Sequence, residues 1–207
     1  MAIVQIGSQY WFKENLAVES FQDGTPIAEV SSSEQWEAYS QSGTPGWCYY
    51  NFDEGMEEEY GKLYNWHAVS GSHASIAPTG FRVPTEGDWN TLVSVQGGTK
   101  VAGNKLKNTA NWSTLSKNSG NGNNESVFTG NPNGYMKENG EQYDFGWSAN
   151  FWTATTSSAA TAVSTRLYWS NDNVVNINTP FGMGLAIRLV HSSSYSGSMS
   201  GNPAIDF

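Results

Sequence analysis

Short apolar runs separated by turn residues, rather than long periodic stretches, dominate the pattern of this chain. The run Ile3–Ile6 predicts a first strand, and the turn at residues 7–9 leads into a second strand at Tyr10–Lys13. Further strands are predicted in the second half of the chain, at residues 151–154, 163–169, 173–176 and 185–190. The last run alternates apolar residues with small or polar ones, which favours a strand.

A first short helix is predicted early in the chain. Two overlapping pairs, Ser31 with Glu34 and Ser32 with Gln35, have the spacing of a capping box, in which a serine side chain accepts a bond from a backbone N–H three residues later. Trp36 and Tyr39 then lie three residues apart, on one helical face. We therefore expect a helix over residues 33–41.

A second short helix is predicted after the sequence Phe-Arg-Val-Pro. Thr85 is a good N-cap residue, and the carboxylate of Asp88 favours the positive end of a helix dipole. Trp89 and Leu92 follow on one face. The pattern predicts a helix over residues 86–95.

Loops take much of the remaining length. Residues 47–69 are strongly aromatic and predict short strands around an acidic loop, while residues 99–150 are rich in Gly and Asn, which tolerate positive φ. Because the strands do not alternate with helices of about 10–15 residues, the expected fold class is α+β rather than α/β. We expect one domain over residues 1–190 and a Ser/Gly-rich arm or linker over residues 191–207.

Composition excludes several classes of function. The 207 residues carry 10 Lys and Arg against 19 Asp and Glu, a net charge of −9, so the basic patch that binds nucleic acid is not expected. No apolar run is long enough to span a membrane, and the N-terminal residues show no pattern of a signal peptide. With nine Trp, ten Tyr and nine Phe but only 14% charged residues, the chain predicts a core of large rings under a neutral, polar surface.

Catalytic and metal-binding motifs are not found, and we expect no enzyme activity, no metal and no cofactor. Cys48 is the one cysteine and lies among aromatic residues, which favours a buried, unreactive thiol. His67 follows Trp66 in a predicted aromatic strand, which favours a histidine satisfied in the core. Two weaker alternatives are calcium sites, one in the acidic loop 53–59 and one at 171–173.

Recognition chemistry is concentrated late in the chain. Between Thr153 and Met183 only Arg166 and Asp172 are charged, and the rest is largely Ser, Thr, Asn, Ala and Val with a few rings. Such mixtures suit adaptable binding surfaces, because rings supply contact area and small polar groups supply hydrogen bonds. Ordinary strand and turn residues of a β-rich protein would give the same composition.

A series of phrases in fixed order links the chain to a known family. They are Tyr10-Trp11-Phe12-Lys13-Glu14-Asn15-Leu16, Tyr60-Gly61-Lys62-Leu63-Tyr64-Asn65-Trp66-His67, Pro78-Thr79-Gly80-Phe81-Arg82-Val83-Pro84-Thr85, Phe151-Trp152-Thr153 and Gly184-Leu185-Ala186-Ile187-Arg188. In this order they resemble the Fibrobacter succinogenes major paralogous domain, a family of surface-associated proteins, over roughly residues 3–190.

The resemblance implies a C-type-lectin-like fold, similar to that of the variable proteins of diversity-generating retroelements. In those proteins the segment between the Phe-Trp strand and the closing Gly-to-Arg strand forms an exposed, mutable binding face. Transferred to this chain, the segment is 155–183, and the face would carry Val163, Thr165, Arg166, Tyr168, Trp169, Ser170, Asn171, Asp172, Asn176, Asn178, Thr179 and Phe181. Tyr168, Trp169 and Phe181 would be its anchors.

The expected function is therefore recognition of a cell-surface protein or glycan. Many relatives are secreted lipoproteins with signals that this chain does not show, which favours a phage tail protein or a tethered module over a bacterial lipoprotein. The expected location is the virion, as part of a phage tail, or the bacterial cell surface, as an adhesin. By analogy with phage tails a homotrimer is expected. The alternatives are a carbohydrate-binding module of fixed specificity and a degenerate oxidase. The oxidase is disfavoured because the related formylglycine-generating enzymes use a pair of cysteines near the C-terminus, whereas the one cysteine of this chain is Cys48.

Overall fold

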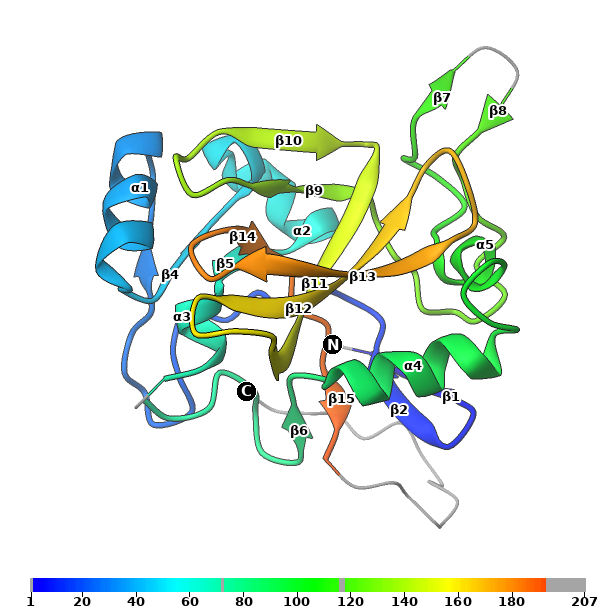
Figure 1. Ribbon diagram of the computed structural model, residues 1–207, viewed down its shortest axis with the longest axis horizontal. Helices are drawn as coiled ribbons and strands as arrows, with labels where there is room; N and C mark the ends of the chain where they lie inside the picture. Colours follow the sequence, from blue (N-terminus) through cyan, green and yellow to red (C-terminus); the bar gives the residue numbers. More distant parts are fainter. Residues whose placement is uncertain (1, 72, 116–117, 193–207) are drawn as a thin grey trace.

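Two mostly antiparallel β-sheets and several short helices make up the computed structural model, which describes residues 2–71, 73–115 and 118–192 (Figure 1). The α+β class predicted from the sequence is confirmed. The predicted arm or linker over 191–207 lies outside the described residues except for His191 and Ser192.

The smaller sheet joins the two ends of the domain. Within the described residues it has four strands in the order β1-β2-β15-β6. Their bounds are β1 Ile3–Ile6, β2 Gln9–Phe12, β6 Phe81–Arg82 and β15 Val190–His191. The predicted first two strands are confirmed, and Val190 pairs with Trp11 in the middle of the sheet.

The larger sheet carries the late part of the chain. Nine described strands follow the order β13-β12-β11-β9-β14-β5-β4-β3, with β10 paired to β9. Their bounds are β3 Ala28–Glu29, β4 Gly46–Cys48, β5 Leu63–Asn65, β9 Asn133–Met136, β10 Gln142–Phe145, β11 Ser148–Thr156, β12 Thr161–Tyr168, β13 Val174–Pro180 and β14 Gly184–Leu185. Most pairs are antiparallel, and β13 lies at one edge of the sheet.

Short helices and a small hairpin complete the fold. The helices are α1 Ser33–Ser42, α2 Glu57–Tyr60, α3 Trp66–Val69, α4 Glu86–Val95 and α5 Ala102–Leu106, with 3₁₀ turns η1 Tyr50–Phe52 and η2 Glu54–Met56. The hairpin pairs β7 Thr114–Leu115 with β8 Asn118–Ser119. No helix in the described part of the chain has both the length and the apolar character needed to cross a bilayer.

Both predicted helices are confirmed, with Ser32 rather than Ser31 as the cap of α1 and Thr85 as the cap of α4. The Ser32 side chain accepts a hydrogen bond from the Gln35 backbone N–H at the start of α1, and Gly43 ends that helix with φ of 71°. A left-handed residue at this position favours glycine, because in other residues the Cβ would come too close to the following carbonyl oxygen. Thr85 and Asp88 form a complete capping box at the start of α4.

Two predictions of local structure are wrong. Residues 185–190 are not one strand: β14 ends at Leu185 in the larger sheet, and β15 begins at Val190 in the smaller sheet. Between them the chain passes from one sheet to the other and changes hydrogen-bond partners, so continuous pairing is impossible. Trp66 and His67 are not in a strand either, since Asn65 caps the short helix α3 with its side chain.

The buried rings form separate clusters on the two faces of β11. Successive strand residues point to opposite faces, and accordingly Phe151 packs with the cluster around α4 while Trp152 packs with the cluster around β5. The predicted core of large rings is confirmed, since Trp11, Trp47, Trp66, Trp89 and Trp152 are all buried. β11 is therefore held on both sides by aromatic packing.

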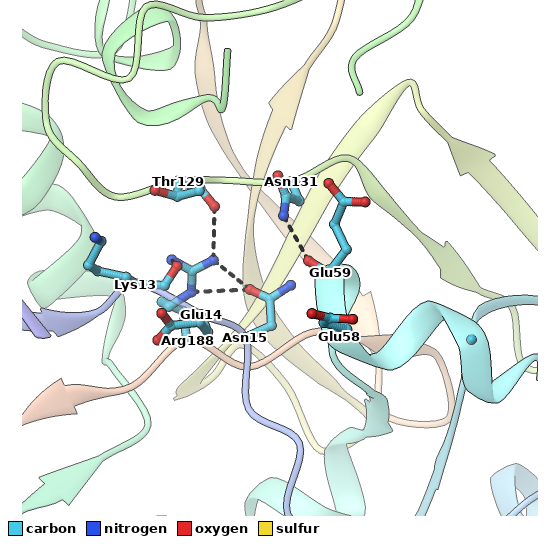
Figure 2. Close-up of a pocket in the computed structure, with 9 residues that line it drawn as sticks. Lys13, Glu14, Asn15, Glu58, Glu59, Thr129, Asn131 and Arg188 are labelled. Atoms are coloured by element: carbon cyan, nitrogen blue, oxygen red, sulfur yellow. Dashed lines mark hydrogen bonds between the residues drawn. The ribbon is translucent and has the colours of Figure 1, made fainter. Parts of the chain in front are cut away.

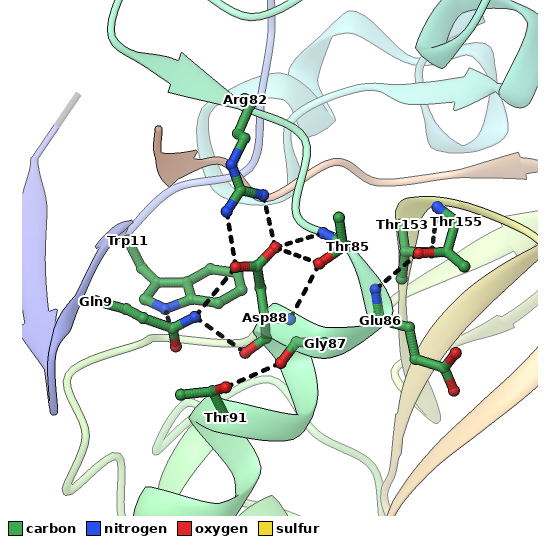
Figure 3. A network of polar contacts seen from close by, with 10 residues as sticks. All are labelled: Gln9, Trp11, Arg82, Thr85, Glu86, Gly87, Asp88, Thr91, Thr153 and Thr155. Carbon is green, nitrogen blue, oxygen red and sulfur yellow. Dashed lines mark hydrogen bonds and ion pairs between the residues drawn. The ribbon is translucent and has the colours of Figure 1, made fainter. Parts of the chain in front are cut away.

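The capping network of α4 fixes the helix to three other elements (Figure 3). Asp88 accepts two hydrogen bonds from Arg82 of β6, at 2.6 and 2.8 Å, and one from the side-chain amide of Gln9 of β2. The Glu86 backbone N–H donates to the Thr155 hydroxyl of β11. The amino end of α4 is thereby attached to both sheets.

The charge on Asp88 should contribute measurably to stability. Partial burial alone would raise its pKa, but hydrogen bonds from Arg82 and Thr85 outweigh that effect and lower the pKa of Asp88 from 3.8 to about 2. The stabilisation is therefore fully present above about pH 4 and is lost as the pH falls through about 2. We predict that Asp88→Asn lowers the unfolding free energy by about 1–2 kcal/mol at neutral pH.

Urea unfolding at several pH values checks this prediction. The gap between wild type and Asp88→Asn should narrow as the pH drops below about 4. Glu37→Gln, which removes an exposed carboxylate from α1, serves as control and should change little. A gap that is constant over this pH range would show that the charge of Asp88 is not responsible.

Candidate functional site

The hairpin of β12 and β13 carries most of the predicted binding residues, and its register shows which of them share a face. Arg166 lies opposite Val175, and Ser164 lies opposite Ile177, so these four residues are on one face. Thr165 and its partner Asn176 are on the other face, which lies against α4. The predicted residues therefore divide between two faces and cannot form a single surface.

Most of the predicted residues nevertheless reach solvent. The exposed ones are Ser170, Asn171, Asp172, Asn176 and Asn178, and the partly exposed ones are Arg166, Tyr168, Trp169 and Phe181. The late segment is thus accessible over much of its length, as the predicted binding face requires.

Three predicted face residues are buried, which corrects their assignment. Val163 and Thr165 lie on the covered face of β12, where the Thr165 hydroxyl donates to Asn176. Thr179 lies on the other face, but its hydroxyl is 2.7 Å from that of Ser164 in a buried pair. These side chains support the hairpin and are out of reach of a partner.

Phe181 has a different environment from the one expected of a binding anchor. Its ring stacks on Trp66 with centroids 4.2 Å apart and an interplanar angle of 13°, and the ring of His67 meets it edge-on. One face of the ring is therefore used in packing. His67 itself is half-buried, and burial lowers its pKa, in agreement with a packing role.

An open part remains on the face of β12 and β13 that carries Arg166. We call this surface the open face and define it by the residues of that face and of the adjoining chain that are at least partly exposed: Tyr135, Lys137, Arg166, Tyr168, Val175, Ile177 and Met183. Val175 is 47% exposed, unusually high for an apolar strand residue. Tyr135 and Lys137 come from β9 and its turn, which the sequence predicted only as loop.

Charged and aromatic groups form a ladder across this surface. The guanidinium carbon of Arg166 lies 5.2 Å from the ring centre of Tyr135, which stacks with Tyr143 of β10 at 5.9 Å. Lys137 places its ammonium 3.8 Å from the ring centre of Tyr143. Cation–π contacts of this kind fix long side chains in one orientation.

The turn after β12 is held from inside by a lysine. Lys107 is 2% exposed, and its ammonium donates to the backbone carbonyls of Tyr168 and Asn171 and lies 3.3 Å from the Asp172 carboxylate. Burial lowers its pKa, while Asp172 acts in the opposite direction. A fixed positive charge thus already occupies the position facing Asp172, which disfavours the alternative of a calcium site there.

The acidic loop does not gather into a metal site. Asp53 accepts a hydrogen bond from the Gly55 backbone N–H, and Glu57 contacts the hydroxyl of Tyr49 and the ammonium of Lys62. Among the described residues no group of three or more His, Cys, Asp and Glu side chains is placed to hold a metal ion. Cys48 is fully buried, as predicted, and burial raises the pKa of its thiol.

A pocket of about 520 Å³ lies beside Arg188 (Figure 2). The Arg188 guanidinium is 1% exposed and donates to the backbone carbonyls of Phe12, Lys13, Phe128 and Thr129 and to the side-chain oxygen of Asn15. Burial lowers the pKa of Arg188, and the nearby charge of Glu14 partly counteracts this. Since its donors are used within the protein, the arginine is a structural group that joins three chain segments.

With this geometry established, sequence comparison identifies the family. The chain belongs to the Fibrobacter succinogenes major domain family, whose pattern it matches over residues 4–191. No curated protein and no solved structure gives a match to the sequence. The match ends at His191, the last residue of β15.

Removal of the Arg188 network should destabilise the whole domain. We predict that Arg188→Met lowers the unfolding free energy by about 3–5 kcal/mol, because buried carbonyls would lose their donors. Chemical denaturation measures the effect. Lys13→Met removes a less buried cation from the same pocket and should cost at most about 0.5 kcal/mol; equal losses in the two variants would contradict the assigned role.

Proposed function

We propose that this protein is a binding protein that recognises a macromolecular ligand through the open face. The proposal includes a C-type-lectin-like fold, with β11, β12 and β13 as the frame of the recognition surface. The observation that carries it is the combination of an exposed apolar side chain, Val175, with the fixed guanidinium of Arg166 on the last two strands of the larger sheet. Arginine and tyrosine, which the open face carries as Arg166, Tyr135 and Tyr168, are enriched among the residues that supply most of the binding energy at protein interfaces, and the buried centre of such interfaces is more apolar than its rim.

The way in which the face is supported favours recognition by a preorganised surface. Trp152 and Phe151 hold β11 from both sides, and β11 in turn pairs with β12 along its length. A surface that is rigid before binding loses less conformational entropy when the partner docks. Changes in the exposed side chains would alter specificity while the supporting core stays the same.

The proposed setting is a phage tail in the virion or a bacterial cell surface, where the partner is a cell-surface protein or glycan. In this proposal the segment 155–183 is diversified by a retroelement, and tail copies assemble as homotrimers. Because buried side chains cannot contact a partner, we expect the variation within that segment at positions that reach solvent, such as the exposed Val175 and the partly exposed Tyr168 and Ile177.

A fixed-specificity sugar-binding module is the second candidate, and one observation favours it. Trp147 and Trp169 are both partly exposed and meet edge-to-face, with ring centres 5.0 Å apart. Exposed tryptophan rings are suitable platforms for the apolar side of a sugar ring. A glycan array that gives one invariant sugar preference, lost in Trp169→Ala, would favour this candidate.

The proposal predicts that added charge weakens binding on one face of β13 only. The protein is screened against a glycan array and a synthetic library of hexapeptides with amidated C-termini. The selected binders are then titrated against wild type and two variants. Val175→Asp, on the open face, should weaken them by about tenfold or more, because the aspartate must be desolvated in the interface. Asn178→Asp adds the same charge on the opposite face and should leave affinity unchanged.

The comparison is valid only if both variants melt close to wild type. We expect this because Val175 and Asn178 are both exposed. Equal effects of Val175→Asp and Asn178→Asp would contradict the open face as the binding surface. A wild-type protein without any selected binder in either screen would contradict a binding role for it.

A further inference from the structure

The open face contains a pocket whose walls combine a guanidinium with apolar groups. Its volume is about 370 Å³, and it is lined by Tyr135, Lys137, Glu138, Asn139, Arg166 and Met183. The lining comes from β9 and its turn, from β12 and from the segment before β14. These parts are far apart in sequence, so the pocket exists only in the folded chain.

Arg166 is held in the pocket by a buried hydrogen-bond system. Its Nε donates to the side-chain oxygen of Asn150 at 2.5 Å. Asn150 is 1% exposed, and its own amide group donates to the Gly134 carbonyl at 3.0 Å and to the Ser148 hydroxyl at 2.7 Å. The Asn150 side chain is therefore fixed, and it fixes one edge of the guanidinium.

The other edge of the guanidinium is available. Within the described part of the chain no residue accepts a hydrogen bond from the two terminal nitrogens, Nη1 and Nη2, and no carboxylate forms an ion pair with Arg166. Such an edge presents parallel N–H groups that match the two oxygens of a carboxylate. A cation–π contact with the ring of Tyr135, whose centre is 5.2 Å from the guanidinium carbon, also restrains the Arg166 side chain.

The surrounding charges allow an anion to bind. Lys137 adds a second cation at the rim of the pocket, opposed there by the exposed carboxylate of Glu138. Two further carboxylates lie nearby. Burial is the main cause of the raised pKa of Tyr135, and the charge of Asp144 adds to it. The contact with Tyr143 is the main cause of the raised pKa of Lys137, and the charge of Glu141 adds to it. Within the lining itself two cations face one carboxylate.

We propose that this pocket binds a carboxylate of a polypeptide ligand, with the Nη1 and Nη2 groups of Arg166 as a bidentate donor and Lys137 as a second positive charge. The inference rests on the proposed binding function and specifies the chemistry of that same face. A carboxylate fits because its planar pair of oxygens matches the free edge of a guanidinium.

The neighbouring surface favours a polypeptide over a sugar as the source of that carboxylate. The ring of Tyr135 lies between Arg166 and Tyr143, and Lys137 covers Tyr143, so these rings do not offer the open faces on which sugars stack. Met183, Val175 and Ile177 instead provide apolar area beside the cation. Flexible methionine next to arginine is typical of surfaces that bind protein side chains.

The hexapeptide library described above tests the inference. Selected peptides should carry Asp or Glu at one fixed position, and the change to Asn or Gln there should weaken binding to the wild type by about tenfold. With Arg166→Gln the same peptide change should have an effect of less than about twofold, because the coupled partner is gone. Arg166→Lys keeps the charge without the fork and should retain only part of the coupling.

Each result has a distinct meaning. Two results would overturn the carboxylate pocket and leave the proposed function intact. In the first, the selected peptides lose affinity with Val175→Asp but show no preference for Asp or Glu. In the second, they prefer Asp or Glu, and this preference is unchanged in both Arg166 variants. Binding restricted to uronate sugars on the array, and dependent on Arg166, would overturn the polypeptide source. If Arg166→Gln melts far below wild type, the same comparison is made with Arg166→Lys and Lys137→Gln. In both variants the change of the peptide's acid to its amide should cost less affinity than it does with wild type. A full loss of affinity in both variants would contradict the proposal.

Discussion

The buried guanidinium of Arg188 is the interaction on which the rest of the structure depends. It lies in the segment where the chain leaves β14 of the larger sheet and enters β15 of the smaller sheet, and it donates to carbonyls from two other regions, the end of β2 and the loop at 128–129. Its guanidinium carbon also makes cation–π contacts with Phe128 and Phe151, at 4.4 and 5.6 Å from the ring centres. A charge in this position is costly to bury unless its hydrogen bonds are all satisfied, so the three segments are constrained to one mutual arrangement. That arrangement sets the position of β11.

Because β11 is fixed in this way, the hairpin that pairs with it can use its exposed side chains for recognition. The face against α4 is occupied by Val163, Thr165 and the network around Glu86, whereas the other face opens to solvent from Arg166 outward. The two arginines thus have contrasting roles. Arg188 has its donors used inside the protein, while Arg166 is bound at one edge by Asn150 and keeps the other edge free. The proposed function uses both arginines, Arg188 to hold the platform and Arg166 to contact the ligand.

Local signals in the sequence were sufficient for the helices and for much of the strand pattern. Thr85 and Asp88 predict the start of α4 because a capping box involves only neighbouring residues. The face was less predictable, since burial of Val163 and Thr165 depends on α4, which lies many residues earlier in the chain. Similarly, the apolar pattern of residues 185–190 gives no sign that the chain passes from the larger to the smaller sheet between Leu185 and Val190. The Gly/Asn-rich composition of residues 99–150 predicted loops, so the β9–β10 hairpin that brings Tyr135 and Lys137 to the site was not predicted.

The central claim is that a platform organised around Arg188 holds a recognition face whose own side chains are not needed for folding. A scan of all single substitutions over residues 148–188, displayed on cells and sorted by resistance to protease, tests it directly. The account predicts that Tyr168, Val175 and Ile177 of the open face accept most replacements, while Asn150, Trp152, Leu167 and Arg188 accept almost none. Uniform tolerance along the segment, or intolerance concentrated at the exposed positions, would contradict it.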